Sequence, residues 1–369
     1  MIGEPRRQMA VVLEDVVPFV VMVIMEGCTI GLTIWAKTVM SDHGMSPFVF
    51  VIYTNALASV IFLPYSFLFH RHTRHEEEAS VTPGLVVRFF FMGLTGVTLT
   101  QYFIFVGLDY SSPILVCAMG HLVPTFSFLF ALILRNIKLD LKNRSIQVKM
   151  LGTFITVAGA VFVTLYKGHV VRKSSVLLFH VEQRLFIFAS TPEHWVIGGI
   201  LLAGASFSVS IWNIIQLGTL KHYPQVMKVV FFCSLIGTFQ CTIISLAFER
   251  DLGAWKPRLN TELLLIILTA IFGGVIRSHV QIWCMQLKGP LYATTFKPFG
   301  IIYASFFGIT FFGNSIYYGS IMGAVIMGIG YYVLVWGPIR DEVIPQDQEE
   351  RNGDLLEAKV PLLQGDSQV

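Results

Sequence analysis

The stretch that decides the fold is VVPFVVMVIMEGCTIGLTIWAK, residues 16–37. It is apolar along nearly its whole length, and the one carboxylate inside it is Glu26. A helix needs about 20 mostly apolar residues to cross ~30 Å of hydrocarbon, and it satisfies its own backbone hydrogen bonds in lipid. We therefore expect residues 16–37 to form a membrane-spanning helix. The stretch is too long, and lacks the small-residue cleavage site, for a removed signal peptide.

Nine further runs of the same kind follow along the chain. They lie at 47–69, 85–107, 112–133, 150–166, 194–218, 227–248, 262–286, 290–312 and 317–336. Each run is continuously apolar, whereas the strands of a membrane β-barrel alternate over segments of about ten residues. The sequence therefore predicts an all-α integral membrane protein with ten transmembrane helices.

The composition agrees with this fold class. Of the 369 residues, 54% are hydrophobic and 13% are charged, whereas soluble domains carry roughly 25% charged residues. The mean hydropathy is +0.67, so there is too little polar surface to coat a water-soluble globule of this size. The five cysteines all fall inside apolar runs without metal-ligand spacing, so we expect neither a disulfide framework nor a metal site.

Several function classes lack their usual motifs. The chain has no GxxxxGK nucleotide loop followed by Ser or Thr, no HExxH pair and no GxSxG elbow. It also has no large soluble segment that could hold a catalytic site, and its net charge of +3 gives no sign of a nucleic-acid partner. We expect a protein that is not an enzyme, needs no cofactor and binds no nucleic acid.

The runs fall into two halves of five. The first half is 16–166, the second is 194–336, and a loop at 167–193, expected outside the cytosol, separates them. Because five is odd, the second half must enter the membrane inverted relative to the first, as in many alternating-access transporters. The ends are expected to be a short cytosolic N-terminus at 1–15 and a disordered cytosolic tail at 337–369.

The orientation follows from the positive charges of the connections. If the N-terminus is cytosolic, the cytosolic side carries thirteen Lys and Arg residues and the opposite side seven. Positive residues concentrate on the cytosolic side of membrane proteins, so we expect both termini in the cytosol. The plasma membrane is the expected location, with an endomembrane (ER or vacuole) as the alternative.

Glu26 is the first candidate for a functional group. It is the eleventh of the 22 residues of its run, and an ionisable residue at such depth costs ~2.5–3.5 kcal/mol on insertion scales unless it faces a cavity or a partner. Thr29, Thr33 and Lys37 follow at helical spacing and form one polar stripe with it. We interpret Glu26 as a pathway residue; the alternative is a neutral glutamate that bonds two helices together.

Two cations also lie deep in the predicted helices. Arg277 is in the eighth run with Gln281 on the same face, and Lys297 is in the ninth run beside Pro298. A snorkelling lysine at the membrane interface is the alternative for Lys297. Two deep cations against one deep carboxylate leave a positive excess, which suits a substrate that bears a carboxylate. An ammonium group of the substrate could then face Glu26, as an amino acid would allow.

Two further side chains are candidates for the pathway. His121, in the fourth run, could relay protons near neutral pH, or it could pack between helices with its ring bonded to a carbonyl. Asn213, in the sixth run, could line the pathway or could join helices by a hydrogen bond, as most such groups do.

Several strings resemble one known family along almost the whole of residues 12–340. They are GMSPFVFVIYTNALAS (44–59), GLDYSSPILVCAMGHLVPTFSFLFALILR (107–135), KMLGTFITVAGAVFVTLYKG (149–168), FSVSIWNIIQ (207–216), KGPLYATTFKPFG (288–300) and YYGSIMGAVIMGIGYYVLVWG (317–337). They are similar to the plant nodulin-like, walls-are-thin-related (UMAMIT) group of the EamA drug/metabolite transporter superfamily.

This resemblance implies ten helices in two inverted five-helix EamA repeats. It also implies export or bidirectional movement of amino acids or related metabolites, auxin among them. Members of the group usually carry an amide where Glu26 stands, and asparagine where His121 and Lys297 stand. The chain therefore departs from the family pattern at three positions that we expect on the pathway.

The leading hypothesis is a secondary carrier or facilitator that moves small organic metabolites, amino acids or related carboxylates, by alternating access. The alternative is a regulatory or scaffold membrane protein that retains the transporter fold with little transport. The expected partners are a small-molecule substrate, an amino acid or an auxin-like carboxylate, and the lipid bilayer. Assembly into a homo-oligomer is left open.

Overall fold

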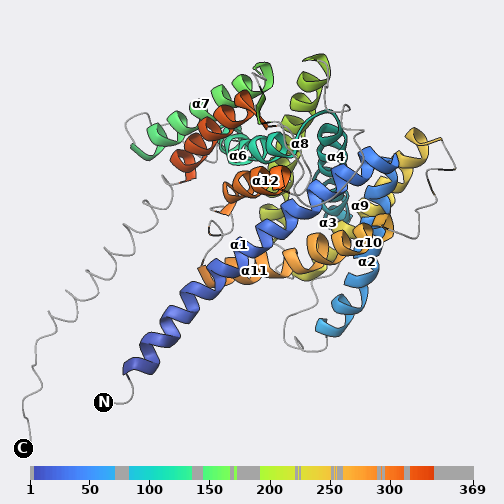
Figure 1. The fold of residues 1–369 in the computed structure, drawn as a ribbon. Helices are drawn as coiled ribbons and strands as arrows, with labels where there is room; N and C mark the ends of the chain where they lie inside the picture. The colour runs from blue at the N-terminus through green and yellow to red at the C-terminus, as the bar shows by residue number, and fades with distance from the viewer. Residues whose placement is uncertain are drawn as a thin grey trace, which may run out of the picture.

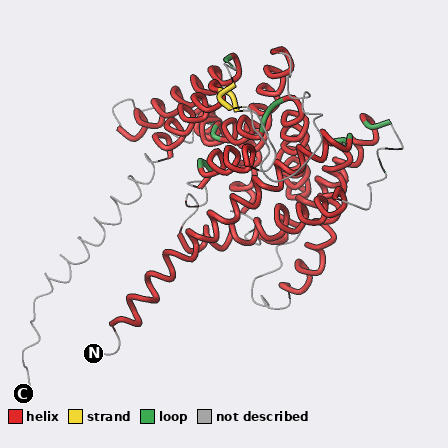
Figure 2. Tube along the Cα trace, viewed as in Figure 1, coloured by secondary structure: helices red, strands yellow, loops and turns green. Residues whose placement is uncertain are grey.

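The protein is described from a computed structural model of the whole chain. The residues that the structure describes are 4–70, 83–134, 144–166, 170–172, 192–220, 223, 226–250, 253, 255, 261–288, 292, 296–310 and 316–335. Nearly all of them are helical, and one short pair of strands is the exception (Figure 2).

The helices of the first half follow one another with short connections. They are α1 (Glu4–His43), α2 (Pro47–His70), α3 (Pro83–Met92), η1 (Gly93–Leu99), α4 (Thr100–Tyr110), α5 (Pro113–Gly120), α6 (Leu122–Ile133) and α7 (Arg144–Leu165). The segment η1 is a π-helix, and it joins α3 and α4 without a break.

The remaining helices follow the segment 167–191. They are α8 (Pro192–Leu220), α9 (Val226–Phe248), α10 (Thr261–Leu268), η2 (Thr269–Ile276), α11 (Arg277–Lys288), α12 (Phe299–Thr310) and a last helix at Tyr318–Val335. The segment η2 is again π-helical, and it joins α10 and α11 without a break. Short π-helical turns inside α-helices are rare and often mark functional sites.

Eight helices among the described residues are long and apolar enough to cross a membrane. Two shorter apolar helices, Pro47–Leu63 and Phe299–Gly308, lie where the second and ninth spans are predicted. The protein is therefore an all-helical, multi-pass membrane protein in its spanning part. The loop predicted at 167–193 falls outside the described residues except for Val170–Arg172 and Pro192–Glu193, and the tail predicted at 337–369 falls wholly outside them.

Three helices differ clearly from the predicted spans. α1 runs from Glu4 to His43, beyond both ends of the span predicted at 16–37 and into the N-terminal segment predicted at 1–15. The fifth apolar run starts at residue 150, but α7 begins at Arg144 because a helix can continue beyond the apolar run into polar residues. The ninth run starts at residue 290, but α12 begins at Phe299. Pro298 directly precedes it, and a proline disfavours helical conformation in the residue before it.

The fourth span is interrupted at His121, where α5 ends and α6 begins. Pro124 explains the interruption: it has no N–H to donate to the carbonyl of Gly120, and its ring would collide with that carbonyl in a regular helix. His121 is thus held at a bend rather than on a straight helix face.

The sequence does not predict the strand pair. β1 (Val170–Arg172) pairs antiparallel with β2 (Ile316–Tyr317), with Val170 opposite Tyr317 and Arg172 opposite Ile316. This pairing joins the segment that follows α7 to the start of the last helix, which also packs against α7. The two strands are too short to leave a signal in the local sequence.

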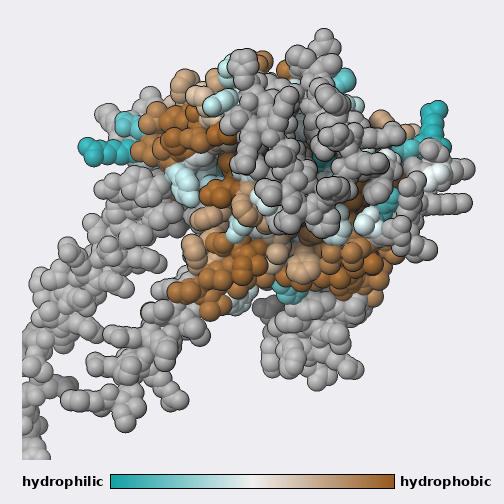
Figure 3. Space-filling model, in the orientation of Figure 1, coloured by the Kyte–Doolittle hydropathy of each residue, from teal (hydrophilic) through white to brown (hydrophobic). Residues whose placement is uncertain are grey.

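Large apolar side chains cover the outside of the helices. Ile133 (73% exposed), Phe154 (72%) and Leu165 (72%) are examples, and Figure 3 shows apolar patches over α7 and along α1 and α10. Water would oppose so much exposed apolar surface, whereas lipid does not. The exposed residues are therefore the lipid-facing ones, and the packed interior is where polar groups collect.

The packing places one helix at the centre of the site. α1 runs diagonally along the body of the molecule, beside α11 and against α12 (Figure 1). α8 packs against α4 and α6, while α9 packs against α2 and η1. Thr29 and Thr33 of α1 face a cavity that is also lined by α2, α4 and η2.

Candidate functional site

A cavity of about 210 Å³ lies between α1, α2, α4 and η2. Its walls are mostly apolar, with several neutral polar groups among them. It is lined by Thr29, Leu32, Thr33, Ala36, Phe50, Thr54, Asn55, Ala58, Gln101, Ile104, Phe105, Thr269, Ala270, Gly273, Gly274 and Arg277. Arg277 is the one charged residue in this lining, and we call this space the central cavity.

A cluster of three charged groups adjoins the central cavity. Glu26 accepts from Arg277, whose Nη2 lies 3.5 Å from Oε2, and Lys297 Nζ lies 3.5 Å from Oε1. Each carboxylate oxygen thus faces one cation. The Glu26 side chain is 9% exposed, against 26% for Arg277 and 40% for Lys297. With one negative and two positive groups, this cluster carries a net charge of +1.

The environment of Glu26 depends on two glycines. Gly27 lets the ring of Tyr303 on α12 approach α1, since a Cβ at Gly27 would lie 3.0 Å from that ring. Gly300, in the first turn of α12, faces the Glu26 carboxylate and Cys117 at ordinary contact distance. The carboxylate therefore sits at the N-terminus of α12, where the partial positive charge of a helix end favours an anion.

Arg277 connects the cluster to the central cavity. It lines both the central cavity and a smaller one of about 20 Å³, whose other lining residues include Glu26, Gln281 and Lys297. The smaller cavity has room for about one water molecule. Four of the predicted site residues therefore meet at one place, with Glu26 far in sequence from the other three. Arg277 is the member of the four that reaches the larger cavity.

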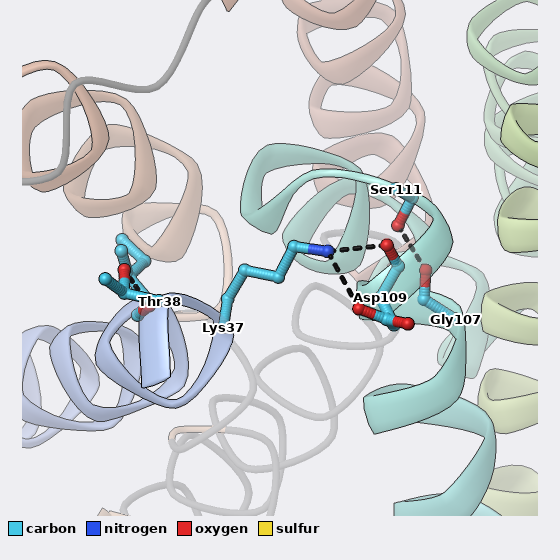
Figure 4. Close-up of polar contacts among 6 residues, drawn as sticks. Lys37, Thr38, Gly107, Asp109 and Ser111 are labelled. Carbon is cyan, nitrogen blue, oxygen red and sulfur yellow. Dashed lines mark hydrogen bonds and ion pairs between the residues drawn. The ribbon is translucent and has the colours of Figure 1, made fainter. Parts of the chain in front are cut away.

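A second ion pair lies farther along α1. Lys37, which is 4% exposed, donates to the backbone carbonyl of Asp109 at 2.5 Å and lies 3.4 Å from its carboxylate (Figure 4). Asp109 is in the last turn of α4, just before Ser111, whose hydroxyl bonds to the carbonyl of Gly107. Glu26 and Lys37 are eleven residues apart on α1, ~16 Å at helical rise, and the cavity-lining residues Thr29 to Ala36 lie between them.

Two predicted site residues line neither cavity. His121 is completely buried and packs on the ring of Tyr331, with ring centroids 4.8 Å apart; within the described residues neither ring nitrogen has a hydrogen-bond partner. Asn213 is half-buried on α8. Neither side chain lines the central cavity or the small one, so the geometry does not bring them together with Glu26, Arg277, Gln281 and Lys297 in these cavities.

The structure adds features that sequence reasoning missed. Asn55 on α2 and Gln101 on α4 form a reciprocal pair of amide hydrogen bonds on the cavity wall, of 2.5 and 3.2 Å. Their apolar surroundings mark them as deep polar groups, but nothing in the sequence indicates that they pair. The π-helical segment η2 also forms one wall of the cavity, and a π-turn leaves no periodic signature in so short a stretch.

Comparison with known proteins places the chain in a family. The EamA-like transporter family matches residues 18–165. Two WAT1-related proteins of Arabidopsis thaliana are each 48% identical, over 95% of this chain and 96% of the relative. A third is 34% identical over 92% of this chain and 90% of the relative. One solved crystal structure superimposes with a TM-score of 0.51 at 15% identity, over 85% of this chain and 94% of that chain; this likeness concerns the fold alone.

The fold and these matches together define a multi-pass membrane transporter of small molecules. The chain belongs to the WAT1-related group of the EamA superfamily. The resemblance seen in the sequence is thereby confirmed. Two of the predicted pathway residues, Glu26 and Lys297, contact each other and form one ion pair.

Proposed function

We propose that this protein is a secondary carrier or facilitator that moves a small organic carboxylate, an amino acid or a related acid, by alternating access. The observation that carries the proposal is the chemistry of the central cavity. Arg277 is its one charged lining residue, and the charged cluster behind it has an excess of one positive charge. A bound carboxylate would supply the missing negative charge.

Arg277 has donors to spare for such a ligand. A guanidinium carries five N–H groups in a planar fork that suits a carboxylate. Among the described residues, one of these groups is directed toward Glu26 at 3.5 Å. Because Arg277 also lines the central cavity, its other donors can hold a carboxylate there in a bidentate manner.

The size and walls of the cavity fit a small organic molecule. A volume of about 210 Å³ exceeds the ~150 Å³ of an engineered protein cavity that binds benzene. Leu32, Phe50, Ile104 and Phe105 give it apolar walls, as is usual for a ligand site with few polar anchors. An amino acid or an acid with one ring is of suitable size.

The paired contacts of the two halves support ten spans in two inverted repeats. α1 packs on α12, and in the same way α8 packs on α5 and α6. The π-helical segment η2 packs on α2, and η1 packs on α9. Finally, α1 contacts α10 and α11, and α8 contacts α4. Each of these pairs becomes the other when the halves 16–166 and 194–336 are exchanged. The π-helical segments also fall in equivalent spans, the third and the eighth.

The orientation proposed from the positive charges has both termini in the cytosol, with the plasma membrane as the first location to test. In that orientation Glu26 lies on the cytosolic side of the central cavity and Lys37 on the opposite side. The two ion-pair sites on α1 would then stand at opposite ends of the pathway, as gates of an alternating-access carrier would.

Transport by the purified chain in lipid vesicles tests the proposal. Radiolabelled amino acids and aromatic monocarboxylates are offered beside their methyl esters, with wild-type protein and Arg277→Met. We expect the acids to move, the esters to be excluded, and Arg277→Met to abolish uptake. Arg88→Met is the matched control, because Arg88 lies on α3, bonds to the carbonyl of Gly218 and lines neither cavity.

Equal movement of acid and ester would refute the carboxylate site. If no compound moves although the protein is inserted and folded, the result supports the alternative hypothesis of a regulatory or scaffold protein with the transporter fold. The two outcomes are distinct, since the first retains transport and the second does not.

A further inference from the structure

The hydrogen-bonding groups of the central cavity are unevenly divided between donors and acceptors. Thr269 of η2 lines the cavity on the opposite side, and its hydroxyl has no hydrogen-bond partner among the described residues. Apart from Thr269 and Arg277, the polar residues that line the cavity are Thr29, Thr33, Thr54, Asn55 and Gln101. We call these five the acceptor wall, because their free hydrogen-bonding capacity is mostly that of acceptors. All five are neutral, so hydrogen bonding decides what this wall can bind.

The three threonines have already used their hydroxyl protons. Thr29 Oγ1 donates to the carbonyl of Met25 at 2.8 Å, and Thr33 Oγ1 donates to the carbonyl of Thr29 at 2.9 Å. Thr54 Oγ1 donates to the carbonyl of Phe50 at 2.8 Å. A hydroxyl has one proton and two lone pairs. Each of these threonines can therefore only accept from a ligand.

The side-chain amides of Asn55 and Gln101 also have almost all of their N–H groups in hydrogen bonds. Asn55 Nδ2 donates one proton to the carbonyl of Val51 at 2.8 Å and the other to Gln101 Oε1 at 2.5 Å. Gln101 Nε2 donates to Asn55 Oδ1 at 3.2 Å and retains one proton. The carbonyl of Val51 can only accept, which fixes the orientation of the Asn55 amide and, through it, that of Gln101.

The wall therefore offers lone pairs on three hydroxyl oxygens and two amide oxygens, against a single neutral N–H. A ligand group with an N–H or O–H finds partners there. A ligand group that only accepts, or that is purely apolar, displaces water from these oxygens and leaves them unpaired, which is costly. An ammonium group would need a carboxylate to offset its desolvation, and Glu26 already faces two cations.

We propose that the acceptor wall is a subsite for a neutral hydrogen-bond donor of the substrate. The transported acid carries a hydroxyl or a neutral N–H on the part of the molecule remote from its carboxylate. Arg277 binds the carboxylate of the substrate, and the apolar walls contact its apolar part. Gln101 and Asn55 accept the hydrogen bond from its donor group. This assignment rests on the proposed function, and it narrows the substrate class within it.

Four acids of one framework test the subsite. Phenylacetate has no polar group at the para position, and para-hydroxyphenylacetate has a hydrogen-bond donor there. At the same position para-methoxyphenylacetate has an acceptor without a donor, and para-aminomethylphenylacetate has an ammonium group. Binding to the purified full-length chain is followed by thermal stabilisation, and uptake is followed in vesicles. We expect the hydroxy acid to be favoured about tenfold or more over the other three.

Gln101→Met removes the selecting amide at similar volume and should bring the hydroxy and methoxy acids to within about threefold of each other. Gln240→Met is the matched control. Gln240 is a buried glutamine on α9 that bonds to Thr98 and to the carbonyl of Phe90, and it lines neither cavity. The preference should survive in this control.

Three outcomes would overturn the subsite. They are a preference for the plain or methoxy acid, a preference for the ammonium compound, and a hydroxy preference that persists unchanged in Gln101→Met. Each leaves the carrier proposal intact, because acids still bind through Arg277. If none of the four acids binds or moves, the carboxylate site itself fails and the subsite fails with it.

Discussion

Replacement of Glu26 by glutamine should destabilise the protein more than the loss of either cation that it faces. The change keeps the shape of the side chain and removes the one negative charge of the cluster. Arg277 and Lys297 are then left together without a counter-charge, and the net charge of the cluster rises from +1 to +2. Helix packing around position 26 holds them there, since Gly27 lies against the ring of Tyr303.

The exposed fractions of the three side chains determine how much stability Glu26→Gln should cost. Removal of one partner from a buried ion pair costs ~3–5 kcal/mol. The Glu26 side chain is 9% exposed, but Arg277 is 26% and Lys297 is 40% exposed, so the cations are only partly buried and the full cost does not apply. We therefore expect a loss of about 2–3 kcal/mol in the free energy of unfolding. Lys297→Met leaves one carboxylate with one guanidinium and should cost less than about 1 kcal/mol.

The assay is a double-mutant cycle on the protein in detergent micelles. Unfolding is followed by tryptophan fluorescence for wild type, Glu26→Gln, Lys297→Met and the double variant. The double variant should be more stable than Glu26→Gln alone, with a coupling energy of about 1 kcal/mol or more. The cycle itself cancels the cost of the chemical change, because Glu26→Gln is made both with and without Lys297.

The reasoning is refuted if Glu26→Gln costs no more than Lys297→Met, or if the two losses simply add. Either result would mean that the carboxylate does not hold the two cations together, and that Glu26 is a helix-joining group of little electrostatic weight.

Three further predictions concern packing, the second ion pair and topology. Gly96→Ala in η1 would place a methyl group inside the ring of Trp212 and should cost about 1–3 kcal/mol of stability. Gly218→Ala, with open space around it, should be neutral or slightly stabilising. Thermal unfolding of the two variants compares their stabilities. Asp109→Asn should cost less than about 1 kcal/mol of stability. The Asp109 carboxylate is 49% exposed, and Lys37 still donates to the backbone carbonyl of residue 109 in the variant. A larger loss in thermal unfolding would contradict this and show that the ion pair is stronger. Asn143, in a glycosylation sequence just before α7, should carry no glycan if that loop is cytosolic, and a glycosidase-sensitive mass shift that Asn143→Gln abolishes would reverse the orientation.

Some features of this protein can be read from the sequence because they are local. Hydropathy in a window of about 20 residues decides whether a segment can cross lipid, and the eight long apolar helices of the described residues lie where the sequence predicts spans. The same windows place Glu26 and Arg277 well inside their spans, and they leave open whether Lys297 reaches the membrane interface. Family membership is predicted from strings such as GMSPFVFVIYTNALAS (44–59) and is confirmed by the relatives.

Helix interruptions are only partly predictable. Pro124 and Pro298 are visible in the sequence. Pro124 interrupts the fourth span because it has no N–H to donate, and Pro298 disfavours helical conformation in the residue before it. The π-helical segments η1 and η2 are not visible, because one extra residue per turn over seven or eight positions changes no apolar pattern. The pairing of β1 with β2 depends on two short segments that are far apart in the chain.

The site itself is decided by tertiary packing. No local pattern indicates that Glu26 and Arg277, 251 residues apart, meet with Lys297, or that His121 and Asn213 do not line the same cavities. Nor does any local pattern indicate that Asn55 and Gln101 bond to each other and so turn their oxygens into the acceptor wall. Local sequence determines how deep a polar group lies, because depth depends on its own helix; which groups meet at that depth depends on how the helices pack, and that is a property of the whole chain.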